Sequence, residues 1–430
     1  MKRVKNTIIG GIFVSLLITP ALLQAASSEP VTLAQCYAWT LERSESLKIR
    51  YEDIVQANAR ARSALGSALP YISWQWSSTW QDPDGVDELN AQGFSGFVEK
   101  QQKEGKFRAE QPLFSGLREF SARAGFKREA KRDELLYQRA KLDLYQATAE
   151  AFYAVVAAES ERENVRAALG LGDDRVGELR EFRKLGKARD TEVATARAHA
   201  AALKGRLDQL EGISMSAREE LSFLTGRDLL AEPLADQISD RPVVPPLDEL
   251  LELARERTDL RAQRENVMAH KLRVRYERGA YWPNADVSGN YYTERETFLE
   301  AIDWDVMLTL EVPIFQGGSV SANVREALSA YRQALLTQEE TERRVLYSVR
   351  RTHNELQAAI QETSSMEEAA MAAQESYDAL KKESSFGLVT NLEMLQALDL
   401  LQEQRTLRDN ARYRMKQLYL NLNVAVEKMP

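Results

Sequence analysis

The chain has few of the residues that usually carry chemistry. Its 430 residues include one cysteine, Cys36, so an intramolecular disulfide is excluded even in an oxidising compartment. A lipid on Cys36 is the less favoured interpretation, because Gln35 and a polar stretch precede it, and a helix position is preferred. The three histidines, His199, His270 and His353, lie far apart in helical stretches, which favours structural or surface roles. We therefore predict no metal, no cofactor and no enzyme.

Long apolar runs are missing after residue 26. Before that point, three basic residues precede an apolar run from Ile8 to Leu23, and small residues follow it. This order is typical of a secretory signal, so we expect residues 1–25 to be cleaved off. A membrane anchor is disfavoured because Pro20 interrupts the run, which is shorter than the ~20 residues of a membrane span. If the mature chain lies in a membrane, it must do so with β-strands.

The sequence also has fewer basic residues than acidic ones, 57 against 65. The net charge is −8, and removing the three basic residues of the signal segment leaves −11. Nucleic-acid binders are usually basic, so this balance argues against a nucleic-acid partner.

One pattern is present twice. The segment PLFSG at 112–116 returns 201 residues later as PIFQG at 313–317, and the same interval relates Gly186 to Gly387. A register held over such a length indicates a duplicated unit. In each copy the motif is expected to close a strand hairpin. Its key residues are Pro112, Phe114, Gly116, Pro313, Phe315 and Gly317.

Short strands are predicted on either side of each hairpin. Between residues 302 and 313, apolar side chains alternate with mostly polar ones, as in a barrel strand with lipid outside and water inside. We expect strands near residues 70–81, 105–112, 283–293 and 302–313. Between the first two, the Gly-rich charged stretch 82–106 is expected to be a surface loop. Tryptophans suited to an interfacial aromatic belt are Trp74, Trp76, Trp80 and Trp304.

Four strands cannot close a barrel by themselves. An open edge in lipid leaves backbone groups unpaired, at a cost of several kcal/mol each. Closure therefore requires several chains. Two chains would supply about eight strands, the smallest usual bacterial barrel, and three would supply about twelve, enough for a water-filled lumen.

The rest of the sequence is helical with coiled-coil spacing. Leu135, Leu142 and Ala149 recur every seven residues. Long helices are expected over 117–185 and 319–386, each about 100 Å long at about 1.5 Å per residue. The predicted fold is mainly α with a small β-barrel part. Its two repeats, 26–231 and 247–430, each run helix, strand, strand, long helix, helix, and they are joined by a Pro-rich linker over 232–246.

These features together resemble the TolC-like outer membrane efflux protein family. The resemblance covers essentially the whole mature chain, and it depends on the signal segment, the doubled order of elements and the Pro-x-Phe-x-Gly motif in each copy. It implies a homotrimer with a twelve-stranded barrel in the outer membrane and an α-helical coiled-coil barrel extending into the periplasm. It also implies a periplasmic adaptor (membrane fusion) protein and an inner-membrane transporter of the RND, ABC or MFS type.

In this family the glycine turns at the ends of the long helices are the tips that dock the adaptor. Here these turns lie at 185–190 and 386–391, and the first departs from the family by being strongly basic. The docking candidates are Leu185, Gly186, Lys187, Ala188, Phe386, Gly387, Leu388, Val389 and Thr390.

Family members with a closed entrance carry carboxylates just inside the tips. The matching positions here are Glu393, Gln396 and Glu192. Three copies of Glu393 around a narrow axis would attract cations and repel anions. Because Gln396 replaces the second acid, the ring is expected to be weaker than in relatives with both acids. The alternative is a glutamate simply solvated on a helix face.

Basic residues near the strand ends, including Arg118, Arg273 and Arg325, suggest a collar that meets lipid head groups of the outer membrane. Solvated helix charges are an equal alternative. The leading prediction is a passive exit duct of a tripartite efflux pump. The channel of a type I protein secretion system is the alternative within the family, and a non-conducting coiled-coil protein that spans the envelope is a third interpretation.

Overall fold

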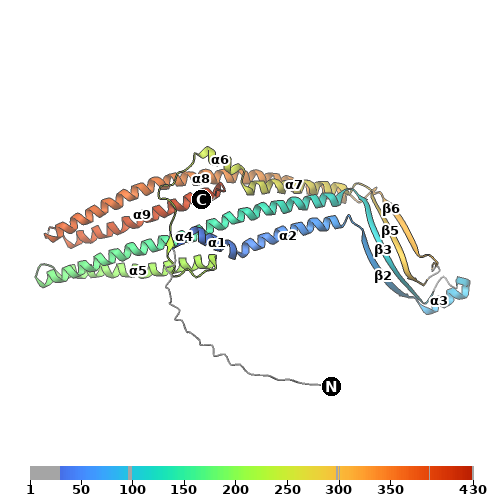
Figure 1. Cartoon of the computed structure of the whole chain (residues 1–430), viewed down its shortest axis with the longest axis horizontal. Coiled ribbons are helices and arrows are strands. Elements are labelled where there is room, and N and C mark those ends of the chain that lie inside the picture. Colours follow the sequence, from blue (N-terminus) through green and yellow to red (C-terminus); the bar gives the residue numbers. More distant parts are fainter. Residues whose placement is uncertain (1–29, 95–98, 297–298, 300, 387, 429–430) are drawn as a thin grey trace, which may run out of the picture.

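The computed structural model describes residues 30–428, except 95–98, 297–298, 300 and 387. The expected signal segment and Gly387 therefore lie outside the described residues. The described chain is an elongated helical body with a four-stranded sheet at one end (Figure 1). At the other end lie two helix–helix turns, one after each long helix. None of its described helices contains a stretch that is long and apolar enough to cross a membrane.

The order of elements occurs twice along the chain. In each half, two helices precede two strands, and a helix of 67 residues and a return helix follow. The helices of the first half are α1 Leu33–Arg43, α2 Glu45–Gly66, α3 Pro83–Leu89, α4 Arg118–Lys184 and α5 Asp190–Thr225. Those of the second half are α6 Leu247–Arg255, α7 Thr258–Gly279, α8 Ser319–Ser385 and α9 Asn391–Ala425.

The single helix expected at the start of each half is in fact two helices. Ser44 follows α1, and its Oγ accepts a hydrogen bond from the backbone N–H of Leu47 at 3.3 Å, which caps α2. A side-chain cap of this kind satisfies a backbone donor that has no partner within the helix. In the second half the break falls before α7, where the buried Arg257 donates from Nη1 to the Ala425 carbonyl at 2.9 Å.

The surface loop expected over residues 82–106 is wrong in part. Asp82 accepts a hydrogen bond from the backbone N–H of Asp84 at 3.3 Å, and Pro83 occupies the first helical position, so α3 begins here. A π-helical turn η1, Asn90–Phe94, follows, and β3 begins at Gln101. An aspartate cap followed by proline is a helix-start signal that the sequence analysis overlooked.

The sheet joins the two halves. Its strands are β2 Tyr71–Trp80, β3 Gln101–Ser115, β5 Asn284–Arg295 and β6 Trp304–Glu311. They pair antiparallel in the order β2-β3-β5-β6, so within the sheet the two halves meet along the β3–β5 ladder. Within the described chain, β2 and β6 are the edge strands.

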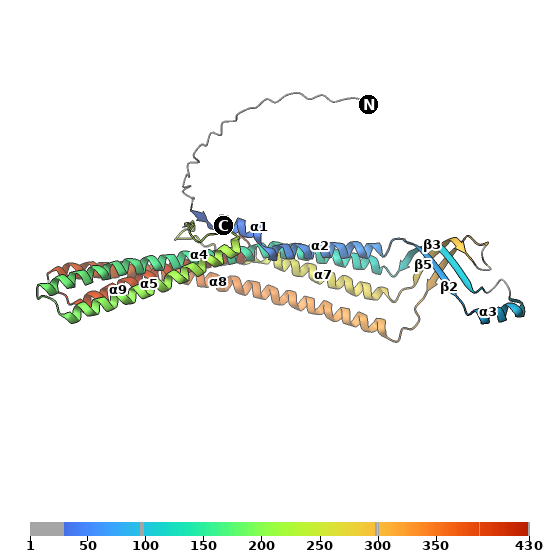
Figure 2. The same cartoon turned by 90° about the horizontal axis from the view of Figure 1, so that it is seen from below.

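Each long helix packs against two shorter ones of its own half. Near the sheet α4 contacts α2 and near the turns it contacts α5, and α8 contacts α7 and α9 in the same way (Figures 1 and 2). The helix α4 also packs against α7 and α9 of the other half. Leu135, Leu142 and Ala149 are buried, as coiled-coil spacing requires. Cys36 is fully buried in a mid-body cluster, and burial raises its pKa to about 12. Its interpretation as a helix residue is therefore confirmed.

The Pro-rich linker crosses the middle of the body. Its strand β4, Leu234–Ala235, pairs in parallel with β1, Val31–Thr32. Lys416 of α9 anchors it, because its Nζ lies 2.6 Å from a carboxylate oxygen of Asp236 and 2.6 Å from one of Asp240. The Lys416 side chain is only 2% exposed, so the linker is held by two ion pairs to one buried cation.

Candidate functional site

Four aromatic side chains form one row across the sheet. The register places Trp74 opposite Phe107, Phe107 opposite Tyr291, and Tyr291 opposite Trp304. Directly opposed residues share a face, so the four rings form a continuous band. Their exposed fractions run from 48% to 65%. Such a band is typical of a surface at a membrane–water interface.

The same face continues as an apolar surface toward the helical body. Ile72, Val306, Leu308 and Leu310 are between 64% and 70% exposed. Trp76 and Trp80 also lie on this face, further from the helices. The structure therefore places all four tryptophans of the expected belt on one face. Phe107 was missed because its strand has a weak alternating pattern in the sequence.

The opposite face of the sheet is polar and internally bonded. Asp305 accepts hydrogen bonds from Asn290 Nδ2 at 2.8 Å and from the Tyr292 hydroxyl at 2.7 Å. Lys106 lies 2.7 Å from a carboxylate oxygen of Glu104. The sheet is thus two-faced, with aromatic and aliphatic groups on one side and bonded charges on the other.

The Pro-x-Phe-x-Gly motifs lie where each hairpin leads into its long helix. Gly116 has a φ of +65°, and a Cβ there would collide with the backbone of Gly279, so only glycine allows β3 to turn against the end of α7. The two copies differ in one respect. Pro112 and Phe114 lie within β3, whereas Pro313 and Phe315 follow the end of β6, and Phe315 is 87% exposed.

The two helical turns lie together at the other end of the body (Figure 1). In the first turn Gly186 has a φ of +70°, and Lys187 donates its backbone N–H to the Phe182 carbonyl at 2.8 Å, as in a helix C-cap. Leu185, Phe386 and Leu388 are 68% to 78% exposed. These three side chains are therefore free to meet a partner.

Two other docking candidates point into the helical core. Ala188 and Val389 are partly buried against the clusters beneath the turns. Gly186 and Lys187 lie in the exposed part of the first turn, and Thr390 begins α9 as its N-cap.

Both predicted entrance carboxylates, Glu393 and Glu192, cap the N-terminus of a return helix. Glu393 Oε2 accepts hydrogen bonds from the Thr390 backbone N–H and from its hydroxyl, each at 2.7 Å. These bonds lower the pKa of Glu393. Glu192 Oε2 accepts from the Arg189 backbone N–H at 2.8 Å, and Gln396 lies exposed one turn beyond Glu393. The Thr-x-x-Glu spacing is a capping box, a signal that the sequence analysis did not use.

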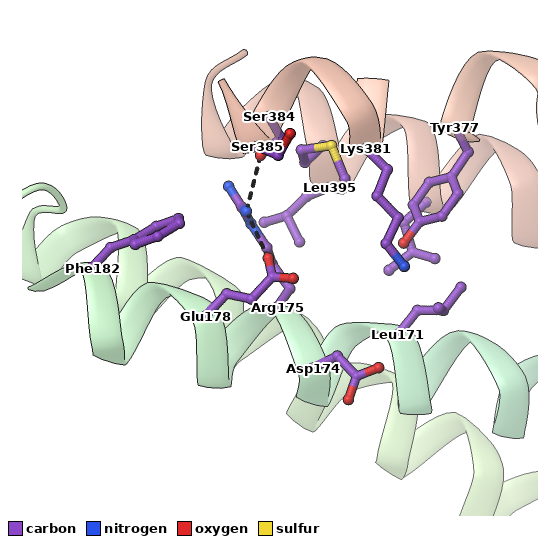
Figure 3. A pocket seen from close by; sticks show the side chains of 12 residues that line it. Leu171, Asp174, Arg175, Glu178, Phe182, Tyr377, Lys381, Ser384, Ser385 and Leu395 are labelled. Atoms are coloured by element: carbon purple, nitrogen blue, oxygen red, sulfur yellow. Dashed lines mark hydrogen bonds and ion pairs between the residues drawn. The ribbon is translucent and has the colours of Figure 1, made fainter. Parts of the chain in front are cut away.

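Arg175 is a tip residue that sequence reasoning missed. Its buried guanidinium donates from Nη1 to Glu178 on the same helix at 3.0 Å and to Ser384 Oγ on α8 at 3.1 Å (Figure 3). Its Nε donates to Asn391 Oδ1 at 3.1 Å. A cavity of about 250 Å³ lies beside it, lined by Tyr377 and other side chains from α4, α8 and α9. Arg175 therefore connects the two helical hairpins, α4–α5 and α8–α9.

The fold and these surfaces together define a class of protein, a long helical body that carries a two-faced antiparallel sheet at one end. Within the described residues, no group of three or more His, Cys, Asp or Glu side chains could hold a metal ion.

Comparisons with known proteins agree with this class. Residues 250–426 match the family model described as outer membrane efflux protein. The chain is 28% identical over 150 residues to the outer membrane protein TolC of Salmonella enteritidis, covering 34% of this chain and 30% of that protein. It is 26% identical over 199 residues to the proteases secretion protein PrtF of Dickeya chrysanthemi, covering 45% and 43%. The matched stretches thus span less than half of either relative.

A solved structure shares the fold over nearly the whole chain. The CmeC outer membrane channel of Campylobacter jejuni superposes with a TM-score of 0.80 at 16% identity, covering 92% of this chain and 85% of that one. The second half of the chain thus matches the outer membrane efflux protein family, and the TolC and CmeC proteins that it resembles are named as outer membrane proteins. The TolC-like resemblance found in the sequence is confirmed.

Proposed function

We propose that the protein is the outer-membrane exit duct of a tripartite efflux pump, a passive conduit for small molecules. The two-faced sheet supports this proposal best. Its aromatic row, from Trp74 to Trp304, suits a lipid interface, and its opposite face, with Asp305 and Lys106, suits water. One sheet face for lipid and one for water is the arrangement that a membrane channel needs.

The conduit would be a homotrimer. The edge strands β2 and β6 each leave a row of backbone groups without a partner strand in the described chain. Within a bilayer each unpaired group costs several kcal/mol, so pairing β2 of one copy with β6 of the next is strongly favoured. Three copies would close about twelve strands into one barrel with a water-filled lumen.

The tips would dock a periplasmic adaptor protein, which in turn would join an inner-membrane transporter of the RND, ABC or MFS type. The exposed Leu185, Phe386 and Leu388 offer apolar contacts for adaptor helices. Energy would come from the transporter, so the duct itself needs no catalytic group. Glu393, with Glu192 and Gln396 nearby, would form the cation-attracting entrance ring.

A second candidate function is supported by the similarity to PrtF, which is named as a proteases secretion protein. On this alternative the duct would serve a type I protein secretion system. Deleting the gene separates the two. Loss of drug or metal tolerance with normal protein secretion supports efflux, and loss of one secreted protein with normal tolerance supports secretion.

The proposed conduit is tested by the single-channel conductance of purified protein in a planar bilayer. Discrete, cation-preferring steps that Glu393→Ala alters would support a pore filtered at the entrance. A silent bilayer despite verified insertion would contradict an open conduit and favour a sealed entrance or the non-conducting structural alternative. The substitution Asn391→Ala, which should loosen the tips, separates these two alternatives: conductance that appears in the variant indicates a sealed entrance, and continued silence indicates the structural protein.

A further inference from the structure

The two helix–helix turns at the end of the body differ in charge. Residues 183–190 in the first turn and 384–391 in the second are related by the interval of 201 residues that relates the two halves. The first stretch has one acidic residue, Asp190, and a net charge of +3. Its four basic residues are Arg183, Lys184, Lys187 and Arg189. The second stretch has no charged residue, so a chain with a net charge of −8 concentrates positive charge on one turn.

The four cations of the first turn are available to a partner. Lys187 and Arg189 are exposed, and neither has an ion-pair partner among the described residues. Arg183 and Lys184 each lie within 2.9 Å of a carboxylate oxygen of the same hairpin, but all four side chains of these two pairs are at least 57% exposed. Exposed ion pairs are weak, so both cations can exchange their partner for a carboxylate of another protein.

The backbone of the first turn holds these cations in a fixed arrangement. Gly186 has a φ of +70°, and the backbone N–H groups of Lys187 and Arg189 are both hydrogen-bonded within the hairpin at 2.8 Å. Leu185 lies among the cations and is 68% exposed. A surface that is already ordered loses less conformational freedom when it binds. The first turn is therefore a preorganised cationic surface with one apolar side chain.

The second turn offers apolar contacts instead. Phe386 and Leu388 are 78% and 75% exposed. The two turns lie together at one end of the body (Figure 1), so a partner that docks there meets both. A membrane would present the same surface to both turns, and segments that bind anionic membranes carry cations around their apolar anchors. The division of charge between the turns therefore favours a protein partner over a lipid surface.

We propose that the first turn docks an acidic segment of the partner protein, rich in Asp and Glu, and that the second turn docks an apolar segment of the same partner. This inference rests on the proposed docking of an adaptor at the tips and specifies the chemistry of that adaptor. Complementary charges raise the rate of association and fix the register of a complex. Because only one turn is charged, the partner has one favoured orientation on the pair of turns.

The first test is photo-crosslinking in the producing cell, mapped by mass spectrometry. The photoreactive residue p-benzoylphenylalanine replaces Leu185 or Phe386, two positions that correspond in the two halves, and all the cations of the first turn stay in place. The protein segment crosslinked from position 185 is expected to contain more Asp and Glu than Lys and Arg, and the segment crosslinked from position 386 to be mainly apolar.

The other outcomes of the crosslinking would overturn the proposal. They are a neutral or basic segment at position 185, a product there that contains phospholipid in place of protein, and protein crosslinks from position 386 alone. In the first and third cases the proposed docking at the tips would still stand. An absence of crosslinks from both positions would count against that docking as well.

The second test measures the association rate of the crosslinked partner, once purified, by biolayer interferometry. From about 50 to about 300 mM NaCl the native rate is expected to fall about tenfold, because salt screens attraction between exposed charges. Lys187→Glu with Arg189→Glu is expected to lower the rate about tenfold at the lower salt concentration and to remove most of the salt dependence. The corresponding pair of glutamine substitutions, which adds no negative charge, is expected to give an intermediate rate.

The matched control reverses two charges away from the turns. Lys204→Glu with Arg350→Glu changes the net charge by the same amount at two exposed positions of the helical body, and is expected to keep the native rate. Equal rates for the two double reversals would overturn the proposal, because the first turn would then contribute no more than the overall charge does. Conductance does not enter either test, so a silent bilayer would count against the conduit alone.

Discussion

Arg175 on α4 donates from Nε to the side-chain carbonyl of Asn391 on α9 at 3.1 Å, and both residues are buried. Asn391 in turn donates from Nδ2 to the Glu192 carbonyl on α5 at 3.3 Å. One amide therefore connects the first hairpin to the start of the second return helix. A buried guanidinium that loses a partner cannot easily regain it from water, which makes this amide a sensitive point for tip geometry.

Replacing Asn391 with alanine should loosen the tips. The substitution leaves Arg175 Nε without a partner in a buried site, at a cost of about 1–3 kcal/mol. We expect a lower melting temperature and a higher basal single-channel conductance, because the hairpins are freer to part. Arg180→Ala, an exposed change on α4 close to Arg175, is the control and should alter neither quantity. Unchanged conductance in a folded Asn391→Ala protein would show that this contact does not restrain the entrance.

The entrance should keep its cation preference in acid. Hydrogen bonds from the Thr390 backbone, and then from its hydroxyl, lower the pKa of Glu393. A lowered pKa means that the carboxylate contributes to stability above its unfolded pKa and loses this contribution only as the pH falls through the lower folded value. Reversal potentials in a KCl gradient should therefore stay cation-selective below pH ~4.3, where an ordinary glutamate is half protonated.

The matching variants are Thr390→Val and Gln396→Ala. Removing the Thr390 hydroxyl should raise the pH at which selectivity fails, and should also weaken the start of α9 by about 0.5–2 kcal/mol. Gln396 carries no charge, so its replacement should leave the pH curve in place. Identical curves for Thr390→Val and the native protein would mean that the Thr390 hydroxyl does not set the pH at which selectivity fails, and a cation preference that persists in Glu393→Gln would mean that Glu393 is not the selective group.

The helices and strands whose apolar pattern repeats over many residues were predictable from the sequence. A seven-residue apolar repeat through Leu135 and Leu142 and the alternation before Val312 extend over enough residues to fix helix and strand. Arg175 was not predictable, because its partner Asn391 is 216 residues away and nothing local indicates the contact. Glu393 shows a different limit, since the same glutamate spacing predicts a charged entrance ring and also a helix cap, and the structure shows the cap.

The linker anchor should fail when its buried lysine is removed. Lys416 holds Asp236 and Asp240, and Lys416→Met leaves both carboxylates without their buried cation. We expect faster elastase cleavage after the exposed Val243 in the neighbouring linker, mapped by mass spectrometry. Arg414→Met, on the exposed side of α9, is the control. Equal cleavage of all three proteins would contradict the anchoring role.

The same anchor should weaken in acid. Burial alone would raise the pKa of Asp240, but hydrogen bonds from Lys416 and Arg412 outweigh it and lower the pKa. The contribution of Asp240 is therefore present above its unfolded pKa and lost as the pH falls through its folded value. Hydrogen exchange of the linker amides should rise below pH ~4, after correction for intrinsic rates, and rise less in Asp240→Asn. Equal exchange of the linker amides in the native protein and in Asp240→Asn at every pH would show that this ion pair is dispensable.

An introduced arginine should be harmful on the apolar face of β6 and tolerated on its polar face. Leu308 is 68% exposed on the apolar face, and the next residue, Thr309, lies on the polar face. An arginine facing lipid near the middle of a bilayer costs about 2–4 kcal/mol, whereas one facing a water-filled lumen costs far less. Leu308→Arg should therefore reduce the amount of protein recovered in the outer-membrane fraction, and Thr309→Arg should not. If Thr309→Arg were the damaging change, the apolar face would have to line the interior, and the barrel proposed for three copies of this chain would be wrong.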